Sequence, residues 1–156
     1  MADASLTTMT VAELAKRIES KGVSPVEVAE AFIERTEATE PQLNAWITRL
    51  PEQSRAAANQ AEAEIAAGNY KGPLHGIPFG VKDQIKTEGV RTTMASIIAD
   101  DFGSEEDATV VAKLKAAGAI LLGKNNMHEF GKGSSINFHF GEPRNLWNME
   151  YEASHS

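Results

Sequence analysis

The sequence predicts an α/β fold in which N-terminal helices precede part of a β-sheet. Residues 1–70 hold apolar side chains at helical spacing between clear helix start and stop signals. Residues 72–156 instead hold short apolar runs of strand character, separated by an amphipathic segment. With 156 residues, 42% of them hydrophobic, the chain is long enough to bury a core. We therefore expect 1–156 to belong to a single domain, mainly helical over 1–70 and built of sheet and loops over 72–156.

The helical region is predicted from capping signals. Thr10 and Glu13 in TVAE have the spacing of a capping box, and Ser24 and Glu27 in SPVE repeat it. Apolar residues that share one helix face follow each box, so two short helices are expected. A third helix, rich in Ala, Glu and Gln, is predicted over residues 51–67, directly before a glycine that would end it.

The sheet region is predicted from apolar runs. The segments AWITRL (45–50), IPFGVKD (77–83) and AILLGK (119–124) have the length and composition of strands. Residues 107–118 show the pattern of an amphipathic helix, and the order strand, helix, strand is that of a crossover unit. The rest of the chain is rich in Gly, Ser and Asn, which predicts loops and one short helix near 126–130.

Composition argues against several classes of function. The formal net charge is −7 and the 15 Lys and Arg residues are scattered, so no nucleic-acid partner is expected. The absence of cysteine excludes thiolate zinc sites and a cysteine nucleophile. Apolar runs are short and the N-terminal segment lacks the pattern of a signal peptide, so we expect no membrane contact and a cytoplasmic location.

Common catalytic and metal motifs are also missing. No G-x-S-x-G, Walker or G-x-G-x-x-G motif occurs, which disfavours a conventional serine triad and a nucleotide site. The histidines match no metal-ligand spacing, so no metal site is predicted and they are interpreted as loop or interface residues. They are His75, His128, His139 and His155.

Lys82 is notable because it ends an apolar run that otherwise predicts a buried strand. Gly80 and Lys82 would share one face of this strand, with the glycine leaving room beside the amine. Burial would lower the pKa of the amine and let it act as a base near neutral pH. Alternatively, Lys82 lies at a sheet edge and pairs with Asp83 as a surface charge. The residues alone leave both interpretations open.

Several serines lie in the C-terminal segment, in GKGSS and in EASHS. Serine clusters of this kind are commonly plain turns, in which the hydroxyls bond to the local backbone. A serine and a lysine can also form a catalytic pair. The residues concerned are Ser134, Ser135, Ser154 and Ser156.

The motifs GPLHGIPFGVKD, KNNMHEFGKGSS and FGEPRNLWN, in this order, resemble the N-terminal part of the amidase signature family of serine hydrolases. The opening helices resemble the start of that family too, so the resemblance covers nearly the whole chain. It implies an incomplete amidase signature fold, in which N-terminal helices are followed by part of a mixed β-sheet flanked by helices. Residues 72–156 would then supply the sheet and the active-site loops.

The resemblance also implies a Ser-cis-Ser-Lys catalytic set. Lys82 matches the lysine of the family motif G-x-P-x-x-V-K-D, and Ser156 matches the bridging serine, whereas the nucleophilic serine would lie beyond residue 156. Ser154 and His155 stand where the family has glycines. No metal or organic cofactor is implied. Residues expected to bind substrate by analogy are Met127, Gly133, Ser134 and Ser135.

The function that follows is hydrolysis of an amide C–N bond, with the 156 residues inactive by themselves. Because KNNMHEFGKGSS is most similar to the glutaminase subunit of tRNA-dependent amidotransferases, that role is the first alternative. A truncated, non-catalytic module is the second. The expected partners are a small-molecule amide and the remainder of an amidase chain, with no direct contact to nucleic acid or membrane. A homodimer is left open.

Overall fold

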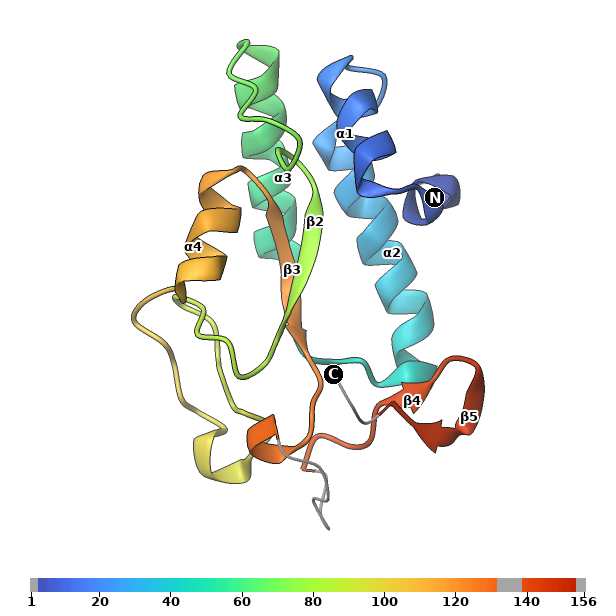
Figure 1. Cartoon of the computed structure of the whole chain (residues 1–156), viewed down its shortest axis with the longest axis vertical. Coiled ribbons are helices and arrows are strands. Elements are labelled where there is room, and N and C mark those ends of the chain that lie inside the picture. The colour runs from blue at the N-terminus through green and yellow to red at the C-terminus, as the bar shows by residue number, and fades with distance from the viewer. Residues whose placement is uncertain (1–2, 132–138, 154–156) are drawn as a thin grey trace. The chain divides into compact units, whose positions relative to one another are not determined.

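The computed structural model describes residues 3–131 and 139–153. Its helices, traced in Figure 1, are α1 (Val11–Glu19), α2 (Pro25–Leu43), α3 (Pro51–Ala66) and α4 (Thr109–Ala116). Short 3-10 turns are η1 (Ala4–Thr8), η2 (Ile97–Ala99) and η3 (Glu129–Gly131). Strands are β1 (Trp46–Arg49), β2 (Pro78–Lys82), β3 (Ile120–Asn125), β4 (Arg144–Asn145) and β5 (Asn148–Glu152).

The central sheet is mixed, with the strand order β1-β3-β2. β1 pairs with β3 in the antiparallel sense. β2 and β3 run parallel, because Ile120 N–H donates to the Ile77 carbonyl near their starts and Asp83 N–H donates to the Asn125 carbonyl at their ends. These features confirm the expected α/β fold with part of a mixed sheet.

The chain divides into two compact units. Unit 1 consists of Met1–Ala38, Leu50–Phe79 and Ala112–Leu122, and unit 2 of Thr39–Arg49, Gly80–Val111 and Gly123–Ser156. Strands β2 and β3 contribute residues to both units. The first halves of these strands therefore belong to the helical unit, and their ends belong to the unit that carries Lys82.

Unit 1 is held together by apolar side chains from its helices. The two predicted capping boxes are confirmed: Glu13 N–H donates to Thr10 Oγ1, and Glu27 N–H donates to Ser24 Oγ, with each glutamate accepting a bond in return. With capped N-termini, the helices bury their apolar faces. Full burial of a Leu, Ile or Val side chain stabilises the folded state by roughly 1.5–3 kcal/mol. The main cluster contains Leu6, Leu14, Ile18, Val23, Val28, Ala31, Ile65 and Ile77.

Three local predictions were wrong. α2 is not short but continues to Leu43, past Pro41. The Glu40 carboxylate accepts bonds from the N–H groups of Ala45 and Trp46, so this polar last turn is joined to the start of β1. The short helix near 126–130 is only the 3-10 turn η3, in which Phe130 has φ 51°, outside the helical range.

The third difference is the hairpin of β4 and β5, which lies in a segment expected to be loop. Arg144 pairs with Glu152 and Asn145 with Asn148. β4 has only two residues, but β5 (NMEYE) alternates polar and apolar residues, a strand signal that the prediction of loop for this segment did not use. At the turn between the two strands, Trp147 N–H donates to Asn145 Oδ1.

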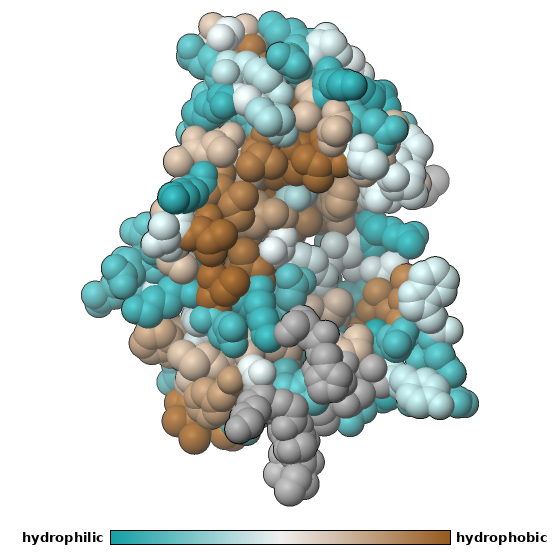
Figure 2. Space-filling model, in the orientation of Figure 1, coloured by the Kyte–Doolittle hydropathy of each residue, from teal (hydrophilic) through white to brown (hydrophobic). Residues whose placement is uncertain are grey.

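The surface carries several exposed apolar residues, including Ile97, Ile98 and Trp147. Figure 2 shows apolar surface over η2. Among residues 3–131 and 139–153, no helix is long and apolar enough to span a bilayer.

Candidate functional site

Lys82 is the last residue of β2 and its side chain is half-buried. Gly80, two residues earlier, does not leave open space, contrary to the expectation from the sequence. A Cβ at Gly80 would lie 2.7 Å from the Trp46 ring and 2.8 Å from Asn125 Oδ1. The glycine therefore leaves room for the side chains of Trp46 and Asn125 to pack directly on the β2 backbone, two residues before Lys82.

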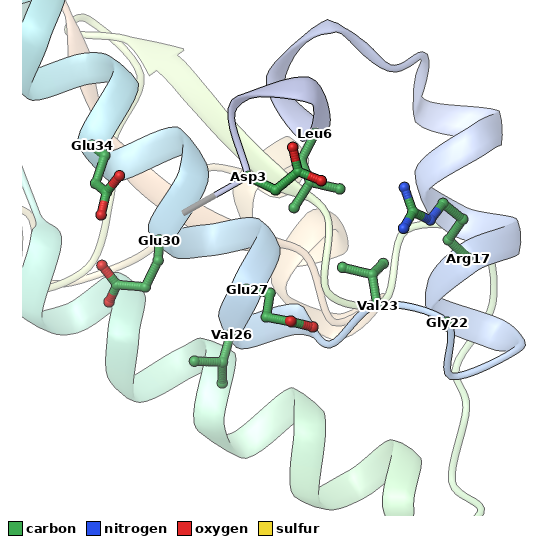
Figure 3. A pocket seen from close by; sticks show the side chains of 9 residues that line it. All are labelled: Asp3, Leu6, Arg17, Gly22, Val23, Val26, Glu27, Glu30 and Glu34. Carbon is green, nitrogen blue, oxygen red and sulfur yellow. The ribbon is translucent and has the colours of Figure 1, made fainter. Parts of the chain in front are cut away.

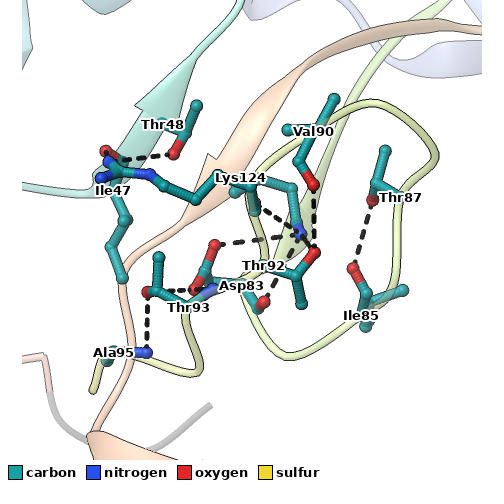
Figure 4. A network of polar contacts seen from close by, with 11 residues as sticks. Ile47, Thr48, Asp83, Ile85, Thr87, Val90, Thr92, Thr93, Ala95 and Lys124 are labelled. Carbon is teal, nitrogen blue, oxygen red and sulfur yellow. Dashed lines mark hydrogen bonds and ion pairs between the residues drawn. The ribbon is translucent and has the colours of Figure 1, made fainter. Parts of the chain in front are cut away.

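The residue after Lys82 is a buried acid. Asp83 Oδ2 accepts a 2.8 Å bond from Thr93 N–H and a 2.6 Å bond from the Thr93 hydroxyl. Its own N–H donates to the Asn125 carbonyl at 3.1 Å. Asp83 is thus joined to β3 through its backbone and to the loop at 92–95 through its side chain (Figure 4).

A second lysine, Lys124 of β3, lies beside Asp83 and is fully buried. Its Nζ donates at 2.8 Å to Thr92 Oγ1 and at 3.4 Å to the Asp83 and Arg91 carbonyls. The same Nζ is 3.8 Å from Asp83 Oδ1. Burial lowers the pKa of Lys124, whereas the Asp83 carboxylate opposes this shift.

Sequence reasoning missed Lys124. The available signal was that AILLGK, like PFGVK, ends an apolar strand in a lysine. Because the two strands are parallel neighbours, their ends meet at the same edge of the sheet. Lysines at both ends could have been recognised as one site.

Met127 is buried directly after β3. Its N–H donates to Asn126 Oδ1 at 2.7 Å, and the Asn126 amide donates to the carbonyls of Asn44 and Gly141. These bonds hold the segment that leads from β3 toward η3. The other predicted site residues, Gly133, Ser134, Ser135 and Ser156, lie outside the described residues, as do Ser154 and His155.

His75 lies in the turn before β2, as expected of a loop residue, and its side chain is fully buried in unit 1. Nδ1 accepts a 3.1 Å bond from Lys71 N–H, and Nε2 is 3.1 Å from Glu64 Oε2. Burial is the main cause that lowers the pKa of His75. A Cβ at Gly118, where φ is +83°, would lie 2.3 Å from the His75 ring, so the histidine fills the space that this turn provides.

A separate groove of about 540 Å³ lies on unit 1 and carries acidic side chains. Figure 3 shows four carboxylates and Arg17 around it. Two of the acids have structural partners: Glu27 accepts from Ser24 N–H, and Glu30 pairs with Arg55 at 2.6 Å. Within residues 3–131 and 139–153, no group of three or more His, Cys, Asp or Glu side chains could hold a metal ion.

Comparison with known proteins supports an amidase relationship. The family model described as Amidase matches residues 27–156, well over half of the chain. A Glutamyl-tRNA(Gln) amidotransferase subunit from Geobacter metallireducens is 48% identical over 143 residues, which are 91% of this chain and 29% of that protein.

Solved structures of similar fold support the same relationship. One, from a vestigial protein complex reported to reveal the evolutionary origins of an s-triazine catabolic enzyme, is 36% identical with a TM-score of 0.89, covering 95% of this chain and 33% of its own. A bacterial aryl acylamidase is 31% identical with a TM-score of 0.86, covering 93% of this chain and 31% of its own. The chain spans about a third or less of the length of these relatives. With the family model and both folds in agreement, the chain belongs to the amidase signature family.

Proposed function

We propose that the protein containing this chain hydrolyses amide C–N bonds through a Ser-cis-Ser-Lys relay. The observation that carries the proposal is the position of Lys82 at the end of β2, within the G-x-P-x-x-V-K-D motif and inside the region matched by the family model. The Asp83 N–H bond to the Asn125 carbonyl holds this strand end against β3, and the Trp46 side chain packs on it at Gly80. In this proposal residues 1–156 form the N-terminal part of one amidase domain.

In the proposed reaction, neutral Lys82 takes a proton from the Ser156 hydroxyl. Ser156 in turn takes one from a nucleophilic serine further along the protein, whose oxygen attacks the amide carbonyl. Backbone N–H groups stabilise the resulting oxyanion. The C–N bond then breaks, the amine leaves with the relayed proton, and water hydrolyses the acyl-serine to release the acid.

Substrate contacts belong to the proposal as well. The segment after β3 would line the acyl site, and its proposed contacts are Met127, Gly133, Ser134 and Ser135. Met127 is held by the Asn126 hydrogen bonds, which supports a fixed wall at this place. The relay uses only side-chain and backbone groups.

A second candidate is favoured by the names of the relatives. The Geobacter relative and one of Azoarcus sp., 49% identical over 139 residues, both carry the name of the same Glutamyl-tRNA(Gln) amidotransferase subunit. In this alternative the amide is that of glutamine, and the released ammonia passes to a partner subunit. The same Lys82 relay would operate, so only the substrate and the acceptor differ.

The test uses the full-length protein and measures product release from simple amides and from glutamine. Lys82→Ala removes the proposed base, so turnover should fall by roughly 100- to 10,000-fold. Lys82→Arg should fail as well, because a guanidinium stays protonated and cannot accept the proton. Lys86→Ala, at an exposed lysine paired with Glu106, is the control and should keep full activity. Substantial turnover by Lys82→Arg would contradict the assigned role.

The two candidates separate on substrate and partner. An amidase should hydrolyse simple amides without any other protein. A glutaminase subunit should prefer glutamine and release ammonia faster when its partner subunits and glutamyl-tRNA are present. Measuring ammonia from both substrates, with and without those partners, distinguishes the two.

A further inference from the structure

The proposed relay does not use the buried polar cluster of Asp83, Thr92, Thr93 and Lys124. All four side chains are fully buried. Removing a lysine and an aspartate from water is unfavourable, and a buried pair of this kind does not by itself indicate added stability. A gain in overall stability therefore does not by itself account for the cluster.

We propose that Lys124 is a positioning residue for Lys82, acting through Asp83. The inference rests on the proposed function, because it assigns Lys124 to the same catalytic base. Lys124 does not take part in the proton relay. Its role is to fix the peptide that joins Lys82 to Asp83, and through it the direction of the Lys82 side chain.

The first support is the set of bonds to this peptide and its neighbours. Asp83 N–H donates to the Asn125 carbonyl at 3.1 Å, and the Asp83 carbonyl accepts from Lys124 Nζ at 3.4 Å. The Lys82 carbonyl accepts a 2.9 Å bond from Ile85 N–H. The backbone is thus held on both sides of the bond between Lys82 and Asp83.

The second support comes from the groups that lie opposite the two oxygens of the Asp83 carboxylate. Oδ2 accepts both bonds from Thr93, whereas Oδ1 is buried and has no hydrogen-bond partner. The group facing Oδ1 is Lys124 Nζ, 3.8 Å away. Without the lysine, this oxygen would be a buried charge with nothing opposite it, so Asp83 would be driven out of its place.

The third support is the loop that the cluster holds. Met94 and Ala95 both have positive φ, 53° and 56°, which is unfavourable for residues with a side chain. Ala95 N–H donates to Thr93 Oγ1, the hydroxyl that also donates to Asp83. Thr92 Oγ1 accepts from Lys124 at 2.8 Å. One charge pair therefore ties β2, β3 and this strained loop together (Figure 4).

The geometry separates positioning from catalysis. Lys82 ends β2 and Asp83 follows it directly, so the two residues share one peptide bond. The effect of Lys124 on Lys82 passes through the backbone. A change at Lys124 should therefore alter the rate of the chemical step more than substrate binding.

The experiment uses the full-length protein and the double variant Asp83→Asn with Lys124→Met. This pair of changes removes both charges at nearly constant volume, so that neither charge is left uncompensated. We expect kcat to fall on the order of 100-fold, the loss that a displacement of about 1 Å can cause, with KM nearly unchanged. Lys86→Met, at a lysine exposed to solvent, is the matched control and should leave both constants unchanged.

A second measurement does not depend on turnover. Hydrogen–deuterium exchange at residues 78–85 should accelerate about tenfold or more in the double variant, since loss of one charged hydrogen bond can release this much local stability. Exchange in α3 of unit 1 should stay unchanged. If the double variant does not fold, Thr92→Val replaces it, because it keeps both charges and removes the 2.8 Å bond from Lys124 together with the longer 3.4 Å bond that Thr92 Oγ1 donates to the Val90 carbonyl. In Thr92→Val we expect the same pattern with a kcat loss of about tenfold.

The outcomes are distinct. Retained kcat, or a rise in KM alone, would overturn the positioning role, as would unchanged exchange at residues 78–85. A wild-type protein that hydrolyses no amide would instead refute the proposed function. In that case the exchange result alone decides whether Lys124 holds the end of β2.

Discussion

Lys82 and Lys124 show how differently one residue type can be used at neighbouring strand ends. Lys82 is half-buried at the end of β2, whereas Lys124 is fully buried against Asp83. Both follow apolar strand residues, and the sequence around each looks alike. The burial of Lys124 is compensated by the Asp83 carboxylate and the Thr92 hydroxyl, which lie close by in unit 2.

At Gly80 we predict a packing penalty. Gly80→Ala should destabilise the protein by roughly 1–3 kcal/mol, because the new Cβ would push against Trp46 and Asn125. Denaturant unfolding of the full-length protein measures the effect. Gly103→Ala is the matched control, since no atom lies within 4 Å of its Cβ position, and it should change stability by less than about 0.5 kcal/mol. Equal stability of the two variants would show that the Trp46 contact is not tight.

At His75 we predict a pH dependence of stability. Burial lowers the pKa of folded His75 below its usual 6.5, so the unfolded chain binds the proton more readily. The stabilisation is complete above about pH 6.5 and is lost as the pH falls from there toward the folded pKa. Unfolding curves between pH 5 and 8 measure this loss, and His75→Gln should flatten it in that window. An unchanged slope in His75→Gln would assign the effect to other groups.

At the scale of the element, the ends of helices follow from a few local residues. The Ser24 hydroxyl accepts a 3.1 Å bond from Glu27 N–H at the start of α2. We predict that Ser24→Ala lowers the free energy of unfolding by about 1 kcal/mol, whereas Ser24→Thr, which keeps the hydroxyl, changes it little. Thermal or denaturant unfolding compares the two variants. If Ser24→Ala and Ser24→Thr unfold at similar midpoints, the Ser24 hydroxyl does not stabilise the protein.

The same scale explains which elements the sequence predicts. Both capping boxes, β1, β2, α3 and β3 follow the sequence signals, because each depends on residues a few positions apart. The polar last turn of α2 has no apolar spacing, and its continuation past Pro41 depends on how it connects to β1. The missing helix near 126–130 depends likewise on contacts that a local pattern does not contain, whereas the alternation in β5 is a local signal for the β4–β5 hairpin.

At the scale of the whole molecule, several large apolar side chains of unit 2 are exposed. Trp147 is 95% exposed and Ile98 is 84% exposed. Ile98 is part of η2, and Figure 2 shows the apolar surface over this turn. Apolar surface of this kind favours association with another apolar surface.

We therefore predict that the 156-residue chain, prepared alone, associates as its concentration rises. Sedimentation velocity measures this association. Ile98→Ser and Trp147→Ser should weaken it, while Lys113→Ser on the exposed side of α4 should not. A chain that stays monomeric at all concentrations would contradict the prediction.

The sequence by itself determined the family motif, the α/β class, the helix starts and the strand that carries Lys82, because these depend on residue types at short spacing. The tertiary structure decided which polar groups are buried together. The Asp83–Lys124 pair, the contact of Gly80 with Trp46 and the burial of His75 beside Glu64 all join residues distant in the chain. The physical reason is that the penalty for burying a charge or a ring depends on its neighbours in space, and a single sequence does not list them.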